Sequence, residues 1–336
     1  MNSSIFLINL RPFLKLEHMI LNILTLAAGL TLILLGANYL VDGSSSIAKK
    51  FGLSEFIIGL TIVGIGTSSP EMVVSFMSAL QGKADMAVGN IVGSNIFNTL
   101  MILGITALVA PLTITKSNHR KDIPLNIAVT ALLIILGLNF TIFGIGQNEI
   151  SRLDGALLLG LFVWYLWSSF KSDKPAEDEE SKIKEYSNLI SIIMIVGGLA
   201  GLIIGGRLFV NSATAIAKAF GVSDKFIAIT VMAAGTSMPE LATCIVAALK
   251  GRGQLALGNV LGSNIANILL ILGGAALISP LSFSGMTYVD LGVVFACALL
   301  IFISAYTFKK KQLDRIEGAI LLLMEIAYMW YLIANL

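Results

Sequence analysis

The sequence predicts an all-α polytopic membrane protein in which ten transmembrane helices form two inverted repeats of five helices each. Three observations support this fold class: an apolar composition, ten apolar segments, and two motifs that occur once in each half of the chain. Hydrophobic residues make up 56% of the 336 residues, charged residues make up 12%, and the mean hydropathy is +0.89. Soluble domains carry about twice that charged fraction, so a soluble globule is excluded.

Each predicted helix is an apolar segment of roughly 20 residues, the length that crosses a hydrocarbon core about 30 Å thick. The first half contains the segments Met19–Val41, Ser54–Leu80, Met86–Ala110, Ile123–Phe143 and Ile150–Phe170. The second half contains Asn188–Val210, Ser223–Leu249, Leu255–Ser279, Thr287–Phe308 and Leu313–Ile333.

The two halves repeat the same two motifs. The sequence GTSSPE at 66–71 recurs as GTSMPE at 235–240, and GNIVGSNIFN at 89–98 recurs as GNVLGSNIAN at 258–267, each 169 positions later. Apart from Ser69, which corresponds to Met238, the polar residues are kept while the apolar residues around them drift, which favours a shared function over shared packing. Because five is an odd number, the second unit enters the membrane from the opposite side, and inverted repeats place substrate sites near the bilayer midplane.

We predict four parts along the chain: an N-terminal extension at 1–18, a first repeat at 19–170, a polar cytoplasmic linker at 171–187 and a second repeat at 188–336. The linker contains the one markedly polar stretch, KSDKPAEDEE, which is typical of a solvated segment. If the amino terminus is outside, 15 of the 22 basic residues fall in cytoplasmic loops. The positive-inside rule therefore predicts a multi-pass protein of the inner or plasma membrane with both termini outside.

Composition also narrows the partners. The net charge of +2 comes without a basic stripe interleaved with aromatic residues, so we expect no nucleic-acid partner. Cys244 and Cys297 lie in apolar segments without CxxC spacing, which disfavours a disulfide or a zinc site. We expect no cofactor and no enzymatic activity. A monomer is compatible with the sequence, which does not fix the oligomeric state.

A proline interrupts one predicted helix in each half. Pro70 and Pro239 lack an amide proton and their rings crowd the preceding turn, so we expect breaks that leave carbonyls unpaired over 64–67 and 233–236. Unpaired carbonyls at membrane depth are tolerated where they line a cavity or meet a ligand. A cation is the natural ligand for such carbonyls.

The motifs supply the oxygen ligands that hard cations require, since Ca²⁺ takes roughly 6 to 8 oxygens. The candidate set comprises the carboxylates of Glu71 and Glu240, the carbonyls of Thr67 and Thr236, the hydroxyls of Ser68, Ser94, Ser237 and Ser263, and the amide oxygens of Asn98 and Asn267. Two facing carboxylates repel unless they are protonated or bridged by a cation, which is a basis for exchanging one cation for another. Glu325 lies within the last predicted helix and has no counterpart in the first half, and we expect it to pack against a polar partner.

With these motifs, the chain resembles the calcium/cation antiporters, which include the sodium/calcium exchangers, and more closely their compact prokaryotic members. The resemblance covers residues 64–98 and 233–267 and the layout of five plus five helices. It implies four cation sites between the second, third, seventh and eighth helices. It also implies that the first and sixth helices slide against this core to alternate access.

The resemblance further implies a role for each motif residue. Calcium would contact the carboxylates of Glu71 and Glu240 and the carbonyls of Thr67 and Thr236. The implied sodium-contacting groups are Ser68, Ser237, Ser94, Ser263 and the carbonyls of Gly64 and Ala233.

Asn98 and Asn267 depart from the family pattern, in which an aspartate often occupies one of these positions. The site then has one fewer ionisable group, so Na⁺ and H⁺ both stay open as the ion exchanged for Ca²⁺. We expect a secondary antiporter that exports Ca²⁺ in exchange for Na⁺. The alternatives are a Ca²⁺/H⁺ antiporter, an antiporter of other cations such as Na⁺ or K⁺ for H⁺, a passive cation channel and an intramembrane enzyme.

Overall fold

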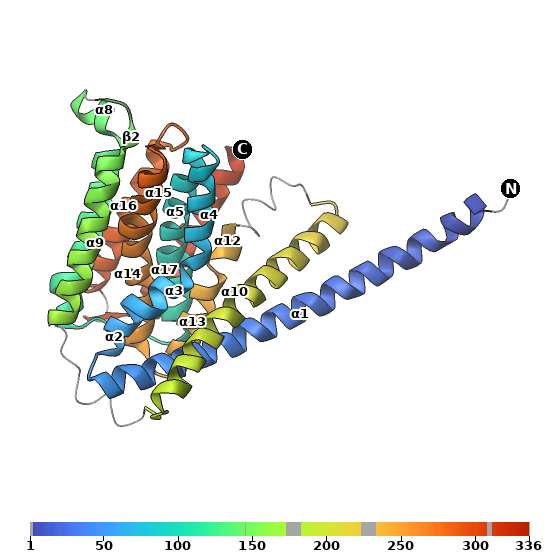
Figure 1. Ribbon diagram of the computed structural model, residues 1–336, viewed down its shortest axis with the longest axis horizontal. Coiled ribbons are helices and arrows are strands. Elements are labelled where there is room, and N and C mark those ends of the chain that lie inside the picture. Colours follow the sequence, from blue (N-terminus) through green and yellow to red (C-terminus); the bar gives the residue numbers. More distant parts are fainter. Residues whose placement is uncertain (1–2, 145, 173–182, 223–232, 308–310, 336) are drawn as a thin grey trace.

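The computed structural model describes residues 3–144, 146–172, 183–222, 233–307 and 311–335, and the chain is built almost entirely of helices (Figure 1). Labels with η mark wide π-helical turns. The first half contains α1 (Ser3–Phe51), α2 (Glu55–Ile58), η1 (Gly59–Val63), α3 (Gly64–Thr67), α4 (Ser69–Leu80), α5 (Ala84–Phe97), η2 (Asn98–Ile102), α6 (Leu103–Val109), β1 (Leu112–Thr113), η3 (Asn118–Asp122), α7 (Ile123–Gly137), α8 (Asn139–Phe143), β2 (Glu149–Ile150) and α9 (Arg152–Ser172). The second half contains α10 (Asn188–Ala219), α12 (Ala233–Thr236), α13 (Met238–Leu249), α14 (Gly253–Ala266), η6 (Asn267–Leu272), α15 (Gly273–Ile278), β3 (Leu281–Ser282), α16 (Tyr288–Ser304), β4 (Gln312–Leu313) and α17 (Arg315–Ala334).

These helices confirm the predicted all-α class. Six of the described helices are long and apolar enough to cross a bilayer: Met19–Phe51, Ala84–Val109, Arg152–Lys171, Asn188–Ala219, Gly253–Ile278 and Arg315–Ala334. The pair Glu55–Thr67 and Ser69–Leu80, bent by 48°, makes a seventh, and Met238–Leu249 and Tyr288–Ser304 are shorter apolar helices. Helix α1 runs through residue 18 without a break. Residues 173–182 of the predicted linker, 223–232 of the predicted seventh helix and 308 lie outside the described residues.

Short strands between the halves display the repeat symmetry. Strand β1 pairs antiparallel with β4, with Leu112 opposite Leu313, and β2 pairs antiparallel with β3, with Ile150 opposite Leu281. Leu112 and Leu281 stand 169 positions apart, the offset of the sequence repeat. The two strand pairs are therefore symmetry equivalents, and each joins a loop of one half to a loop of the other.

Glycine contacts follow the same symmetry. A Cβ atom on Gly155 of α9 would lie 2.8 Å from the carbonyl oxygen of Gly273 in α15, and one on Gly318 of α17 would lie 2.8 Å from that of Gly104 in α6. Such distances mean that the helix backbones touch, which small residues permit in membrane proteins. Helix α9, the last of the first half, therefore packs directly on α15 of the second half. Helix α17, the last of the second half, packs directly on α6 of the first half.

The long helices α1 and α10 cross one another beside this bundle, with their axes oblique to its other helices (Figure 1). Glycines form the crossing: a Cβ atom on Gly36 would lie 2.7 Å from the Gly198 carbonyl oxygen, and one on Gly205 would lie 2.7 Å from that of Gly29. Because glycine has no side chain, the backbones of the two helices come into direct contact at these points.

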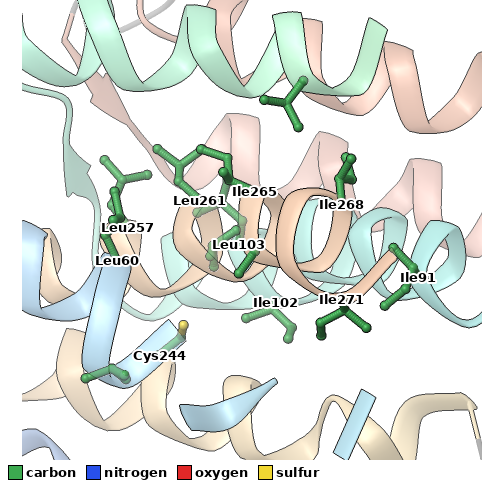
Figure 2. Packing of buried hydrophobic residues seen from close by; sticks show 14 of the residues in the cluster. Leu60, Ile91, Ile102, Leu103, Cys244, Leu257, Leu261, Ile265, Ile268 and Ile271 are labelled. Carbon is green, nitrogen blue, oxygen red and sulfur yellow. The ribbon is translucent and has the colours of Figure 1, made fainter. Parts of the chain in front are cut away.

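The centre of the bundle is the continuous run of α14, η6 and α15. Every residue of α14 from Gln254 to Ala266 is buried, and Leu257, Leu261, Ile265, Ile268 and Ile271 project from this run into the apolar core (Figure 2). A helix that is apolar all round lies inside its protein. The asparagines and serines of the second motif, which lie on this run, are therefore held away from lipid and water.

The glycine crossing gives a stability prediction. We expect Gly198→Val to lower the thermal unfolding midpoint in detergent, because the added Cβ would lie 2.7 Å from both the Gly36 carbonyl oxygen and the Leu40 amide nitrogen. Overpacking of this kind costs about 1–3 kcal/mol. Gly197→Val is the matched control, since a Cβ on Gly197 meets nothing within 4 Å among the described residues. Equal midpoints for the two variants would contradict the proposed backbone contact.

Candidate cation-binding site

Each repeat contains a helix that breaks at the serine two residues before its proline. Helix α3 ends at Thr67 and α4 begins at Ser69, with Pro70 in the first turn of α4, where a missing amide proton costs little. The carbonyl oxygen of Gly66, which has no proline N–H to accept, accepts instead from the Ser69 hydroxyl at 2.7 Å. In the second repeat α12 ends at Thr236 and α13 begins at Met238, so the predicted breaks are confirmed.

The carbonyl of Gly64 differs from the prediction. Its oxygen accepts from the Ser68 amide at 3.1 Å and from the Ser263 hydroxyl at 3.2 Å. The expectation that the break leaves this carbonyl unpaired is therefore wrong. The physical reason is that the chain stays close to helical geometry up to Ser68, and that α14 lies close enough for its serine to donate. For Ala233 the structure describes only the backbone, as the first residue of α12.

The two breaks meet, because each glutamate accepts a hydrogen bond from the opposite repeat. The Ser68 hydroxyl donates to Glu240 Oε1 at 3.0 Å, and the Ser237 hydroxyl donates to Glu71 Oε1 at 3.1 Å. Glu71 is 0% exposed and Glu240 is 1% exposed. The two carboxylates therefore lie in one enclosed region that is formed jointly by both halves.

The serines of the second motif reach the same region by different contacts. Ser94 donates to Glu71 Oε1 at 3.4 Å, and its oxygen lies 3.2 Å from that of Ser237. Ser263 instead donates to the Gly64 carbonyl. Of these two serines, Ser94 therefore contacts a carboxylate, and Ser263 contacts a backbone carbonyl next to the first helix break.

Four buried side-chain oxygens in this part of the described chain have no hydrogen-bond partner: Glu71 Oε2, Glu240 Oε2, Asn98 Oδ1 and Asn267 Oδ1. They form two symmetry-related pairs, one carboxylate and one amide oxygen from each repeat. Leaving a buried polar atom unpaired costs about 1–3 kcal/mol, and more for a charged group. A carboxylate and an amide oxygen are both ligands that a hard cation accepts.

Asn95 and Asn264 hold the amides of Asn98 and Asn267 in this orientation. The Asn98 amide donates to Asn264 Oδ1 at 3.1 Å, and the Asn267 amide donates to Asn95 Oδ1 at 2.9 Å. Because each NH₂ group is engaged across the repeat interface, each carbonyl end is left for other contacts. Asn95 and Asn264 are not among the ligands predicted from the sequence, although both lie in the repeated motif at the same 169-residue offset.

Thr67 and Thr236 are the last helical residues before the two breaks. The Thr67 side chain is fully buried and donates to Asn259 Oδ1 at 3.1 Å, while the Thr236 side chain is partly exposed. Within the described ranges, no three His, Cys, Asp or Glu side chains cluster in a way that could hold a metal. Two carboxylates thus supply the charge of this site, and neutral oxygens must supply the remainder of any ligand shell.

Comparison with known proteins identifies the fold around this site. Residues 21–171 and 190–334 match the family model of the sodium/calcium exchanger protein. The chain belongs to the sodium/calcium exchanger family. The exchanger is accordingly a membrane antiporter that exchanges cations, and it spans the membrane several times.

Relatives cover nearly the whole exchanger. A protein of Alkalimonas amylolytica named as a candidate antiporter, CaxA, is 39% identical over 317 residues, covering 91% of this chain and 97% of that protein. The sodium/calcium exchanger MaX1 of Methanosarcina acetivorans is 32% identical over 345 residues, covering 92% and 97%. The solved structure of the sodium-calcium exchanger NCX_Mj aligns with a TM-score of 0.81 at 32% identity, covering 94% of this chain and 99% of that chain. The ten-helix fold of two inverted repeats agrees with that structure.

The amide network gives the second prediction. We expect Asn264→Ala to destabilise the exchanger by about 1–3 kcal/mol, because the change leaves the buried Asn98 amide without its acceptor. Thermal unfolding in detergent measures the effect. Asn38→Ala is the control, since that amide donates to the Leu34 carbonyl of its own helix. If Asn264→Ala unfolds no earlier than Asn38→Ala, the network does not orient the site.

Proposed function

We propose that this exchanger exports Ca²⁺ in exchange for Na⁺ by alternating access, with the ions bound in mid-membrane between the two broken helices. The observation that carries the proposal is the set of four unpartnered oxygens on Glu71, Glu240, Asn98 and Asn267. These four oxygens are buried. A bound cation stabilises them, whereas the apolar side chains of the core cannot.

Charge supports Ca²⁺ as one substrate. Two ionised glutamates carry the charge that one Ca²⁺ neutralises, and they can equally bind monovalent cations or protons. A single charged residue at the bilayer centre costs about 2.5–3.5 kcal/mol on insertion scales, so an empty, doubly charged site is strongly unfavourable. If the change of access requires a neutralised pair, the empty carrier does not cross, and the flux of one cation is coupled to the opposite flux of the other.

The remaining ligands are proposed from the motif positions. The carbonyls of Thr67 and Thr236 complete the calcium shell, and the sodium ligands are the hydroxyls of Ser68, Ser237, Ser94 and Ser263 with the carbonyls of Gly64 and Ala233. Support comes from the contacts of Ser68 and Ser237 with the glutamates and of Ser263 with Gly64. These hydroxyls can turn from their present acceptors towards a bound ion, because a hydroxyl offers two lone pairs besides its proton.

Polar contacts at one end of α1 support alternating access by movement of α1 and α10. Ser45 of α1 donates to Glu55 Oε1 at 2.8 Å, and Arg252 lies 3.2 Å from the same oxygen, so α1 is tied to the start of α2 and to the loop before α14. Asp42 of α1 also pairs with Lys250 at 2.7 Å. Movement of α1 breaks these contacts. The direct backbone contact at the glycine crossing lets α1 and α10 move together.

Glu185, in the segment before α10, lies 2.9 Å from the ammonium of Lys49 in the last turn of α1, which holds the pKa of that carboxyl below its ordinary value. This pair ties the end of α1 to the segment before α10. The repeat boundaries at 19–170 and 188–336 and the location of both termini outside remain proposals, as does a monomeric state.

Exchange for H⁺ is the second candidate, and Asn98 and Asn267 favour it, because the site has amides at both positions and its ionisable groups are two glutamates. Uptake of ⁴⁵Ca²⁺ into proteoliposomes loaded with Na⁺, compared with uptake driven by a pH gradient alone, separates the two. We expect the Na⁺ gradient to drive uptake when a protonophore is present. Uptake driven by the pH gradient and insensitive to Na⁺ would establish the proton exchanger, and uptake independent of either counter-ion would indicate a channel.

The carboxylates give the third prediction. We expect Glu71→Gln and Glu240→Gln each to reduce Na⁺-driven ⁴⁵Ca²⁺ uptake at least 100-fold, because the one remaining carboxylate leaves half of the divalent charge uncompensated. Glu149→Gln, a change in strand β2 outside the two motifs, is the control and is expected to leave uptake unchanged. Wild-type rates in either site variant would refute the assignment of that glutamate.

The amides give the fourth prediction. We expect Asn98→Asp and Asn267→Asp each to increase the number of monovalent cations exchanged per Ca²⁺ by about one, because an added carboxylate requires one more positive charge for neutralisation. The Na⁺ gradient that just balances a fixed Ca²⁺ gradient in proteoliposomes measures this number. Asn148→Asp in the loop before β2 is the control. An unchanged balance point in both site variants would show that these positions do not set the coupling.

A further inference from the structure

A cavity of about 500 Å³ lies beside the central site, between α5, α12, α16 and α17. Its walls are largely apolar, formed by Val92, Ile96, Phe97, Met101, Met286, Met329 and Leu332. Gly89 and Gly93 of α5 also line it, and a Cβ on either glycine would meet nothing within 4 Å among the described residues. Small-molecule sites in proteins have this size and this apolar character, with few polar groups.

Glu325 is the polar group in this cavity whose contacts the fold does not satisfy. From the sequence we expect it to pack against a polar partner. The structure instead leaves it 2% exposed, lining the cavity, with Oε2 buried and unpartnered within the described chain. A carboxylate oxygen so placed is costly unless a donor meets it.

The second acid of the cavity, Asp290, is already satisfied. Its Oδ1 accepts from the Tyr328 hydroxyl at 2.7 Å, and its Oδ2 accepts from the amide and the hydroxyl of Thr287, at 3.0 and 2.7 Å. The acceptor available to a ligand is therefore Glu325. The described lining contains no Lys, Arg or His that could compensate it.

We propose that this cavity is a binding site for an apolar organic cation that carries a single ammonium group, with the ammonium donating to Glu325 and the apolar body against the methionine, leucine and phenylalanine walls. A divalent metal ion does not fit the same observations, because it requires roughly 6 to 8 oxygen ligands and the cavity offers one free carboxylate. An anionic lipid is disfavoured by the two acids. The flexible methionines suit apolar ligands of varied shape.

The position of the site gives it a consequence for exchange. Ser94 and Thr236 line this cavity and also belong to the central site, where Ser94 donates to Glu71. A bound amine therefore lies against the groups that surround the exchanged ions and slows exchange. That consequence rests on the proposed function, whereas binding itself does not.

The test uses 1-aminoadamantane and its neutral counterpart 1-adamantanol, which share one rigid apolar body and differ in the ammonium group. Isothermal titration of the purified full-length protein in detergent measures saturable binding. We expect the amine to bind at least tenfold more tightly than the alcohol. We expect Glu325→Gln to remove that difference by weakening the amine alone, and the control Glu149→Gln to preserve it. Equal affinities in the unsubstituted protein, absence of saturable binding, or equal weakening of both probes by Glu325→Gln would each overturn the proposal.

A second variant keeps the test decisive if Glu325→Gln does not fold. Gly89→Leu adds a side chain at a glycine that lines the cavity and leaves Glu325 itself unchanged. We expect it to weaken both probes at least tenfold. Unchanged affinity for the amine in this variant would place the binding elsewhere and overturn the proposal. Inhibition of ⁴⁵Ca²⁺ uptake by the amine is measured separately, so that a failure of exchange leaves the binding result intact.

Discussion

The exchange of hydroxyl contacts between the repeats is the interaction on which the site depends. Ser68 donates to the glutamate of the second repeat and Ser237 to the glutamate of the first, over nearly equal distances of 3.0 and 3.1 Å. Neither half can form the site alone, because each carboxylate receives its donor from the other. This reciprocity fixes the two helix breaks opposite one another and brings two acids into a space from which water and lipid are excluded.

The packing of the central helices makes that arrangement possible. A Cβ on Gly262 of α14 would lie 2.3 Å from the Leu60 carbonyl oxygen, and one on Gly258 would lie 2.3 Å from that of Phe56. The backbone of the segment before the first break thus rests directly on α14, which carries Ser263 and is followed directly by Asn267 at the start of η6. The same approach brings Gly64 within reach of the Ser263 hydroxyl, and so pairs a carbonyl that the break alone would have freed.

The repeat explains why much of the fold and site could be predicted from the sequence, and why some contacts could not. Matching polar motifs that recur 169 residues apart, with a proline in each copy, indicate which residues share a site, since symmetry brings equivalent atoms together. Symmetry does not fix rotamers or small departures from it. The donation from Asn95 to the backbone of Asn264, the pairing of the Gly64 carbonyl and the unpartnered oxygen of Glu325 depend on how neighbouring helices pack in three dimensions, and Glu325 has no equivalent in the first half to indicate its role.

Departures from symmetry are themselves informative in a carrier made of inverted repeats, because any one conformation must treat its two ends differently. Ser45 is engaged by Glu55, which Arg252 also contacts, whereas the hydroxyl of Thr214, the residue 169 positions later, is buried without a partner among the described residues. Likewise Gly258 and Gly262 are closed by the backbone of another helix, and the equivalent Gly89 and Gly93 border a cavity. Among the described residues, Ser45, Gly258 and Gly262 are thus held by these contacts, whereas the equivalent Thr214, Gly89 and Gly93 are not. If access alternates as proposed, the opposite conformation exchanges these two arrangements. The nearly buried Glu55–Arg252 pair then opposes that exchange, because breaking a buried ion pair leaves charges that neither lipid nor apolar side chains can compensate.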